Sequence, residues 1–314
     1  MSLLLATTGW DPAPWLRRLE ALLPRHPAAT PETLTDRAAV RYAVCWRPAL
    51  GALADLPNLQ AIFSLGAGVD HLLAAADLPD VPVVRVVDPD LTGRMSEWVA
   101  LHVLLHLRDF RRYERQQRSQ VWDEDVDPPA ASQVRVGVLG FGELGRDAAR
   151  KLKALGFPVA AWSASPKSEP GVECFHGPDG LDALLARTDI LVSLLPLTPA
   201  TRGILDARLF AKLPPDGRLG GPILLNAGRG GLQVEADILA ALDAGVLKAA
   251  SLDVFEQEPL PPASRLWSHP NVIVSPHNAA VSSPGAVARF IAGQIEAFEH
   301  GAPLRHVVDR ARGY

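Results

Sequence analysis

Short apolar runs recur along the first ninety residues, separated by helical or turn-rich stretches. The first three are residues 3–6, 40–45 and 59–65, and a fourth extends from Val83 to Val87. Each run has the length of a buried strand, and the intervening stretches alternate with them in the rhythm of helices. This alternation predicts a parallel sheet flanked by helices, which is an α/β fold.

A longer helical pattern follows, from Ser96 to about Arg118. We expect Ser96 to cap its N-terminus, with Glu97 in the first turn. Its apolar side is expected to carry Trp98, Leu101, Leu105 and Leu107. The next stretch, residues 123–133, contains two adjacent prolines and several acids, which indicates a loop or linker.

A second α/β series begins at Val134. Its first strand is expected to end near Leu139, and apolar residues at helical spacing follow at Leu144, Ala148, Leu152 and Leu155. Further strands are expected at 159–162, 190–195, 223–225, 249–252 and 272–274, and a last helix at about 286–300. Several of these strands are continuously apolar, as strands covered on both faces must be. The fold class predicted is two doubly wound parallel-sheet domains, Rossmann-like or flavodoxin-like.

The composition is that of an ordinary globular protein of about two domains, with 314 residues, 48% of them hydrophobic. A net charge of −4 argues against a general affinity for nucleic acid or for anionic membranes. The two cysteines, Cys45 and Cys174, form no metal-binding spacing and cannot build a disulfide framework. We expect neither a signal peptide nor a membrane-spanning run, so the cytoplasm is the expected compartment.

A glycine-rich turn lies between the first strand and the first helix of the second series. Residues 138–145 read VLGFGELG, which places Gly140, Gly142 and Gly145 in a G-x-G-x-x-G pattern. In dinucleotide-binding folds these glycines permit the tight turn, the approach of the pyrophosphate and close helix packing. The helix N-terminus at Glu143 and Leu144 then presents N–H groups to the phosphates. We expect a dinucleotide site here; the alternative is a turn that serves packing alone.

The end of the second strand indicates which dinucleotide binds. An NAD site usually has Asp or Glu there, bonded to the ribose 2′-hydroxyl. Here Ser163 takes that position, Ser165 and Lys167 follow, and Arg146 comes directly after the third glycine. Hydroxyls and cations can bind a 2′-phosphate, and we see no carboxylate that would repel one. This favours NADPH with NADH possible; the alternative is a polar loop with a relaxed preference.

Chemistry-bearing side chains follow three later strands. Arg229 and His277 each come just after a predicted strand, and an acidic stretch at 253–258 lies between them in sequence. In open α/β sheets ligands bind at these strand ends. Hydride transfer to a 2-keto acid leaves charge on the carbonyl oxygen, which an imidazolium can protonate and a guanidinium can polarise. A nearby carboxylate would hold the imidazole and favour its charged form.

Taken together, these motifs resemble the D-isomer-specific 2-hydroxyacid dehydrogenase family over nearly the whole chain. The matching segments are residues 65–71, 138–145, 195–201, 226–230, 253–259 and 276–277. The resemblance implies that Arg229 binds the substrate and that His277 is the proton donor. It also implies that Glu258, which directly precedes a proline, is the carboxylate partner rather than Glu256.

The same resemblance assigns further contacts. Backbone N–H groups of Ala67, Gly68 and Val69 would meet the substrate carboxylate, and Trp46 would border the substrate pocket. Asp253 would hold the nicotinamide amide. The other cofactor contacts implied are Leu195, Pro196, Thr201, Ala227 and Gly228. The family is metal-free, so no metal is expected.

Within the family the chain resembles the branch that reduces glyoxylate and hydroxypyruvate with NADPH. The segments that carry this likeness are residues 45–47, 94–97, 162–165 and 308–314. One departure is Ala164, where that branch carries arginine, so the 2′-phosphate would depend on Lys167, Arg146 and the hydroxyls. The alternatives are a dinucleotide-sensing, corepressor-like binding protein and an NAD-linked dehydrogenase for a bulkier acid.

The family architecture also implies a domain organisation. A discontinuous substrate domain would comprise residues 1–96 and 284–314, with a dinucleotide-binding domain at 97–283 inserted between. In relatives, the helix from Ser96 and the arm around Trp122 make the contact of a homodimer. The partners expected are therefore a small 2-keto or 2-hydroxy acid and a second copy of the chain, with no nucleic acid and no membrane.

Overall fold

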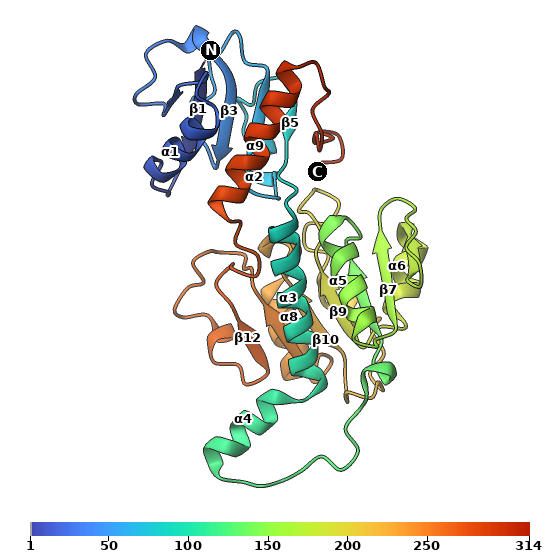
Figure 1. Cartoon of the computed structure of the whole chain (residues 1–314). Helices are drawn as coiled ribbons and strands as arrows, with labels where there is room; N and C mark the ends of the chain where they lie inside the picture. The colour runs from blue at the N-terminus through green and yellow to red at the C-terminus, as the bar shows by residue number, and fades with distance from the viewer. Residues whose placement is uncertain (1) are drawn as a thin grey trace. The chain divides into compact units, whose positions relative to one another are not determined.

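The structure is a computed structural model that describes residues 2–314, and the chain forms two compact units (Figure 1). Unit 1 comprises Met1–Leu91 and Ser282–Tyr314, and unit 2 is Thr92–Val281. The sequence had placed these boundaries after residues 96 and 283. Each unit is built on a parallel sheet with helices, so the predicted fold class is confirmed.

Unit 1 contains a five-stranded sheet in the order β2-β1-β3-β4-β5. The strands are β1 Ser2–Thr7, β2 Ala28–Ala29, β3 Val40–Trp46, β4 Ala61–Ser64 and β5 Val83–Val84, and the helices are α1 Ala13–Leu22, α2 Asp70–Leu73 and α9 Pro284–Glu299. Leu3 and Leu5 pack with α1 and α9, whereas Leu4 packs with α2 on the opposite face. The strand β5 is shorter than the predicted run to Val87, and beyond it Arg85 N bonds to His306 O in the C-terminal segment.

Unit 2 contains a seven-stranded sheet in the order β12-β11-β10-β9-β6-β7-β8. The strands are β6 Val136–Leu139, β7 Val159–Ser163, β8 Glu173–His176, β9 Ile190–Ser193, β10 Ile223–Asn226, β11 Ala249–Leu252 and β12 Val272–Val274. The helices are α3 Pro89–Leu107, which starts in unit 1, α4 Phe110–Ser119, α5 Glu143–Ala154, α6 Gly177–Leu185, α7 Ala207–Phe210 and α8 Glu235–Asp243. Short 3₁₀ turns lie at 37–39, 131–133, 230–232 and 265–267.

Both faces of the unit 2 sheet are covered, which explains why its central strands are largely apolar. In β9, Ile190 and Val192 pack with α3 and α5, whereas Leu191 packs on the other face with α6, α7 and α8. Side chains alternate between the faces of a strand, so a strand covered on both sides needs apolar residues on both faces.

Helix α3 begins earlier than the sequence predicted. The Asp88 carboxylate caps it by accepting a hydrogen bond from Leu91 N at 3.2 Å, and Pro89 occupies the first helical position. Proline suits that position because its missing N–H would have no helical partner there. Ser96 therefore lies inside the helix, where its hydroxyl bonds to Asp147 Oδ2 of α5 at 2.5 Å. The prediction that Ser96 caps the N-terminus is wrong.

The predicted single helix to Arg118 is also two helices. Between α3 and α4, Asp109 has a φ of 44°, a left-handed conformation that breaks the helical path. Asp is one of the few side chains that adopts this conformation at modest cost. The buried side of α3 carries Trp98, Val99 and Val103, whereas Leu101, expected on the apolar side, is exposed.

Candidate active site

The residues assigned to catalysis all belong to unit 2 and follow adjacent strands. β10 ends three residues before Arg229, β11 ends directly before Asp253, and β12 ends three residues before His277. These three strands are neighbours in the sheet and run parallel, so their C-terminal ends lie along one edge. The structure therefore groups at one sheet edge the side chains that the sequence singled out separately.

The imidazole of His277 faces a carboxylate. His277 Nδ1 lies 2.7 Å from Glu258 Oε2, and the two side chains are 38% and 24% exposed. Glu258 Oε1 accepts a hydrogen bond from Phe255 N at 3.1 Å, which fixes the orientation of the carboxylate. Since Nδ1 is engaged by the carboxylate, Nε2 is the ring nitrogen that is available to deliver a proton.

The neighbouring acid, Glu256, has a different partner. Its Oε1 accepts a hydrogen bond from Glu235 N at 2.8 Å, and its own N–H donates to Glu235 Oε1 at 2.7 Å. This reciprocal pair joins the β11 loop to the start of α8. The structure thus places Glu258, and not Glu256, on the imidazole.

The backbone of His277 is in an unusual conformation. Its φ of 52° is left-handed, a region that side-chain-bearing residues rarely occupy. His277 N donates to Asp253 O at 2.7 Å and lies 3.1 Å from Ser275 O. Such a conformation persists only where the surrounding structure holds it, and here the β11 loop does so.

Asp253 is 1% exposed, and its carboxylate binds the loop that carries His277. Oδ1 accepts hydrogen bonds from Ser275 Oγ at 2.6 Å and Asn278 N at 3.0 Å, and Oδ2 accepts one from Ala279 N at 3.0 Å. The carboxylate predicted to hold the nicotinamide amide therefore organises the 275–279 loop, which sequence reasoning did not indicate.

A buried amide pair underlies Arg229, and sequence reasoning missed it. Asn226 Nδ2 donates to Arg229 O at 3.2 Å and to Gln233 Oε1 at 2.8 Å, and Gln233 Nε2 donates to Val254 O at 2.9 Å. These bonds join the loops that follow β10 and β11. The available signal was Asn226 itself, a polar residue that ends an otherwise apolar strand.

The glycine-rich turn has the shape that a dinucleotide requires. Gly140 has a φ of 95°, and a Cβ there would lie 2.7 Å from Leu194 O. A Cβ on Gly142, which caps α5, would meet nothing within 4 Å, so open space adjoins the backbone at the helix N-terminus. A Cβ on Gly145 would collide with Gly140 O. Close packing at the first and third glycines with open access at the second fits a bound pyrophosphate.

The loops after β9 and β10 lie beside this turn. β6 pairs with β7 on one side and with β9 on the other. Successive strands are therefore added in one direction from β6 to β8 and in the opposite direction from β9 onward. A Cβ on Gly228 would lie 2.7 Å from Leu195 O, which puts the Ala227–Gly228 and Leu195–Pro196 segments in contact. Thr201 Oγ1 accepts from Thr198 N at 2.8 Å and donates to Pro196 O at 2.7 Å, closing its loop. Ligands of doubly wound sheets bind at such a reversal.

The loop after β7 contains a carboxylate that the sequence analysis did not take into account. Arg146 Nη1 donates to Glu169 Oε2 at 2.8 Å, and Arg150 Nε donates to Glu169 Oε1 at 2.7 Å. Ser163 Oγ donates to Ser165 O at 2.8 Å. Two arginines neutralise Glu169, so its presence does not contradict the expectation that no carboxylate repels a 2′-phosphate here. Lys167 is exposed on the same loop.

In unit 1 the residues assigned to the substrate lie together. Trp46 ends β3, and residues 67–69 lie between β4 and α2. A Cβ on Gly66 would lie 2.6 Å from the Trp46 ring, so the indole adjoins this loop. Trp10 stacks on Trp46 with ring centroids 5.0 Å apart, and His71 lies 4.6 Å from it. Sequence reasoning did not single out Trp10, which lies three residues past the end of β1, while Trp46 ends the neighbouring β3.

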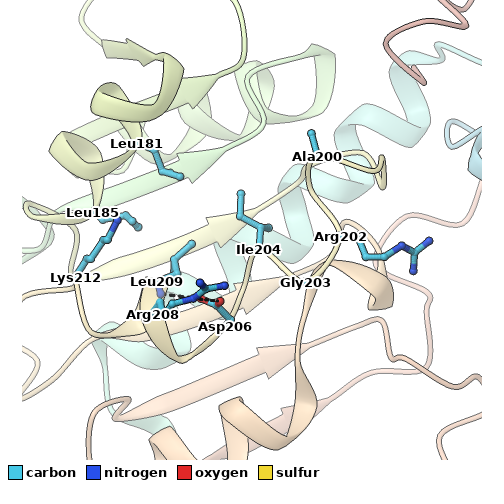
Figure 2. A pocket seen from close by; sticks show the side chains of 10 residues that line it. All are labelled: Leu181, Leu185, Ala200, Arg202, Gly203, Ile204, Asp206, Arg208, Leu209 and Lys212. Carbon is cyan, nitrogen blue, oxygen red and sulfur yellow. Dashed lines mark hydrogen bonds and ion pairs between the residues drawn. The ribbon is translucent and has the colours of Figure 1, made fainter.

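A separate groove in unit 2 contains none of these residues. Its volume is about 420 Å³ (Figure 2), and it is lined by Leu181, Leu185, Ala200, Arg202, Gly203, Ile204, Asp206, Arg208, Leu209 and Lys212. Arg208 pairs with Asp206, and Lys212 pairs with Asp182. None of the residues that line the groove is a histidine, so it has no imidazole and carboxylate pair like that of His277 and Glu258.

Known proteins resemble the chain along its whole length. The NAD-binding domain of D-isomer specific 2-hydroxyacid dehydrogenases matches residues 100–279. Glyoxylate/hydroxypyruvate reductase A of Serratia proteamaculans is 41% identical over 306 residues, which cover 96% of each chain. The NADPH-dependent glyoxylate/hydroxypyruvate reductase of Sinorhizobium meliloti, crystallised with NADP and sulfate, is 49% identical over 100% of both chains, with a TM-score of 0.93.

A further solved structure is equally similar. A probable 2-hydroxyacid dehydrogenase from Rhizobium etli, in complex with NADP, HEPES and L(+)-tartaric acid, is 46% identical. The match covers 100% of this chain and 99% of that one, with a TM-score of 0.95.

Proposed function

Because the chain belongs to the D-isomer specific 2-hydroxyacid dehydrogenase family, we propose that it reduces small 2-keto acids, glyoxylate and hydroxypyruvate, with NADPH. The observation that carries this proposal is the 2.7 Å contact between His277 and Glu258. These two residues and Arg229 follow three neighbouring strands, β12, β11 and β10. Relatives that share 41% and 49% of the sequence bear the names of glyoxylate/hydroxypyruvate reductases, and two similar structures contain NADP.

The proposed division of labour follows from the chemistry of the side chains. NADPH, when bound, supplies the hydride that reduces the keto carbon. His277 donates the proton from Nε2 to the keto oxygen, and Glu258 stabilises the imidazolium through Nδ1. Arg229 binds the substrate carboxylate and polarises the carbonyl with charge-assisted hydrogen bonds. Trp46 and the backbone of Ala67, Gly68 and Val69 are the further substrate contacts we propose.

The cofactor contacts are proposed from the shape and charge of unit 2. The backbone at Gly142 and the N-terminus of α5 would hold the pyrophosphate, because that position is open and rich in N–H groups. Lys167 and Arg146, with the hydroxyls of Ser163 and Ser165, would hold the 2′-phosphate. The remaining proposed contacts are Gly140, Glu143, Leu144, Gly145, Leu195, Pro196, Thr201, Ala227, Gly228 and Asp253.

We also propose that the protein forms a homodimer and that it is located in the cytoplasm. Trp122 and Val126 are 95% and 88% exposed on the segment that follows α4, and this segment lies apart from the unit 2 sheet (Figure 1). Exposed apolar groups gathered on one segment are typical of a protein contact. Among residues 2–314, no helix has the length and apolarity needed to cross a bilayer, and both cysteines are free thiols.

A substrate panel with both cofactors tests the proposal. We expect NADPH oxidation with glyoxylate and hydroxypyruvate, slower oxidation of NADH, and weak activity with phenylpyruvate, because the Trp46 indole beside residues 66–69 favours a small acid. The panel reports kcat/KM for each pair of acid and cofactor. If phenylpyruvate is reduced as efficiently as glyoxylate, the assigned substrate class is wrong. If no keto acid is reduced, the enzymatic role is wrong.

A further inference from the structure

A hydrogen-bond chain connects helix α3 to the loop of the catalytic histidine. Trp98 Nε1 donates to Ser275 Oγ at 3.1 Å, and Ser275 Oγ donates to Asp253 Oδ1 at 2.6 Å. Its direction follows from Trp98, because the indole N–H can only donate. The hydroxyl proton of Ser275 is therefore left to donate to Asp253.

The hydrogen-bond chain ends at Asp253, which binds the backbone of His277 and of the residues that follow it. The carboxylate of Asp253 accepts the N–H groups of Asn278 and Ala279, and its backbone oxygen accepts the N–H of His277 itself. A buried carboxylate is costly unless donors satisfy its lone pairs. If the carboxylate loses a donor, Asp253 should therefore hold the left-handed backbone at His277 less firmly.

The indole is itself held in place. Trp98 is buried, its ring lies 4.0 Å from that of His102, and His102 Nδ1 lies 2.8 Å from Trp98 O. The indole N–H is thus presented to Ser275 by a rigid part of α3. This arrangement is more than space filling, because a phenyl ring would fill most of the same volume but could not donate.

We propose that Trp98 and Ser275 are positioning residues for His277, which they hold through the carboxylate of Asp253. This inference rests on the proposed role of His277 as the proton donor. Proton transfer is sensitive to small displacements of the donor. Loss of the chain should therefore slow the chemical step more than it weakens binding of the keto acid, whose carboxylate is held by Arg229.

The experiment compares the wild type with Trp98→Phe, Ser275→Ala, the double variant and Ser275→Thr. Trp98→Phe removes only the donor, and Ser275→Thr retains the hydroxyl. Trp162→Phe is the matched control, since it removes another buried indole hydrogen bond in unit 2, from Trp162 Nε1 to Gly177 O at 2.7 Å. The measurements are the single-turnover rate of NADPH oxidation, KM for glyoxylate, Kd for NADPH and the melting temperature.

We expect Trp98→Phe to slow the single-turnover rate about threefold to tenfold, and Ser275→Ala by at least as much, as the loss of one hydrogen bond predicts. KM for glyoxylate should change less than about twofold, because the contacts that bind the substrate in the ground state are unchanged. Ser275→Thr should restore most of the rate. The double variant should be about as slow as Ser275→Ala, because both residues act through one chain.

The proposal is overturned if Trp98→Phe and Ser275→Ala keep the wild-type single-turnover rate, or if Trp162→Phe slows it as much as Trp98→Phe. Rates that fall additively in the double variant would also overturn it, because the two residues would then act separately. A wild-type protein that reduces no keto acid would refute the proposed function instead. In that case the melting temperatures and NADPH affinities still show whether Trp98 and Ser275 are coupled.

Discussion

His277 is held by two groups that act on different parts of the residue. Glu258 orients the ring through Nδ1, and Asp253 holds the backbone through a 2.7 Å hydrogen bond. The first interaction sets which nitrogen can deliver a proton, and the second sets where that nitrogen lies. Both come from the loop after β11, so the imidazole and its two supports form one local unit.

Arg229 should matter mainly for recognition of the substrate carboxylate. A charge-assisted, two-pronged contact is worth on the order of 1.5–3 kcal/mol. Arg229→Ala should therefore lower kcat/KM for glyoxylate at least about tenfold. Arg229→Lys should recover only part, because lysine lacks the fork.

Arg202→Ala is the matched control for Arg229, since it removes an exposed arginine of the groove in Figure 2. Steady-state kinetics with glyoxylate at saturating NADPH measure the effect. Full activity in Arg229→Ala would contradict the assigned role.

Ser163 is the position where cofactor preference should respond most to a single charge. The wild type should prefer NADPH about tenfold. We expect no stronger preference, because Ala164 stands where related reductases carry arginine and Arg146 is already paired with Glu169. Ser163→Asp places a carboxylate beside the 2′-phosphate, so the preference should vanish or invert. Ser268→Asp adds the same charge at an exposed position and should leave the ratio unchanged.

The measurement for this loop is the ratio of kcat/KM for NADPH to that for NADH in the three proteins. A wild type that already prefers NADH would show that the loop does not recognise the phosphate. An unchanged ratio in Ser163→Asp would show the same.

At the residue scale, the sequence identifies the side chains proposed to react better than it identifies the residues that hold them in place. Arg229 and His277 stand out because charged or titratable groups directly after buried strands point to a site. The pair of Trp98 and Ser275 is invisible in the sequence, since 177 positions separate its members. Glu169 was overlooked for a related reason, because its partners Arg146 and Arg150 lie on another element.

At the scale of elements, α3 shows how two cap signals compete. Both Asp88 with Pro89 and Ser96 with Glu97 fit a helix start, and the sequence alone offers no way to exclude either. In the structure Asp88 caps the helix, and the later serine bonds instead to Asp147 of α5. The strands were predicted more closely, since β11 and β12 have the predicted bounds. Buried parallel strands have a continuous apolar pattern that helix ends lack.

Helix α3 should also make the protein sensitive to acid. Burial is the main cause that lowers the pKa of His106 from 6.5 to about 3, with the charge of His102 adding to it. Folded His106 is therefore neutral between pH 6.5 and 3, whereas the unfolded chain takes up a proton. The free energy of unfolding should fall as the pH drops through this window, by up to about 1.4 kcal/mol per pH unit.

His106→Gln should make this slope shallower, because glutamine does not titrate but can still bond to Ser251 Oγ, which lies 2.8 Å from His106 Nε2. Urea unfolding at several pH values, at one protein concentration, measures the slope. His300→Gln, at the exposed end of α9, is the control for the loss of an imidazole. Parallel slopes for the wild type and His106→Gln would contradict the prediction.

At the scale of the molecule, the sequence pattern reveals two α/β series but not their connection. Residues 284–299 form α9, which packs with α1 on the first sheet rather than continuing the second. Only the family resemblance implied this return, because a helix at the end of a chain has no local signal for the sheet it will cover. The position of a helix in space depends on contacts that lie far apart in sequence.

The proposed homodimer predicts that the exposed segment after α4 is a contact. Trp122→Asp places a charge where we expect an apolar group to be buried, and such central aromatic groups are worth about 2 kcal/mol or more. The dissociation constant of the dimer should rise at least about thirtyfold. Leu50→Asp, an exposed leucine of unit 1, should have no effect.

Sedimentation velocity over a range of protein concentrations measures this change. A monomeric wild type, or a dimer that is indifferent to Trp122→Asp, would refute the proposed contact.

His277, paired with Glu258 at the strand ends of unit 2, is the acid that we propose for the reduction of a keto acid. The most direct measurement is the single-turnover rate of NADPH oxidation by glyoxylate in His277→Gln, compared with the wild type at equal NADPH occupancy. A general acid contributes about a hundredfold or more, so the rate should fall by at least that factor while NADPH still binds. A His277→Gln protein that reduces glyoxylate at a near-normal rate would contradict the claim.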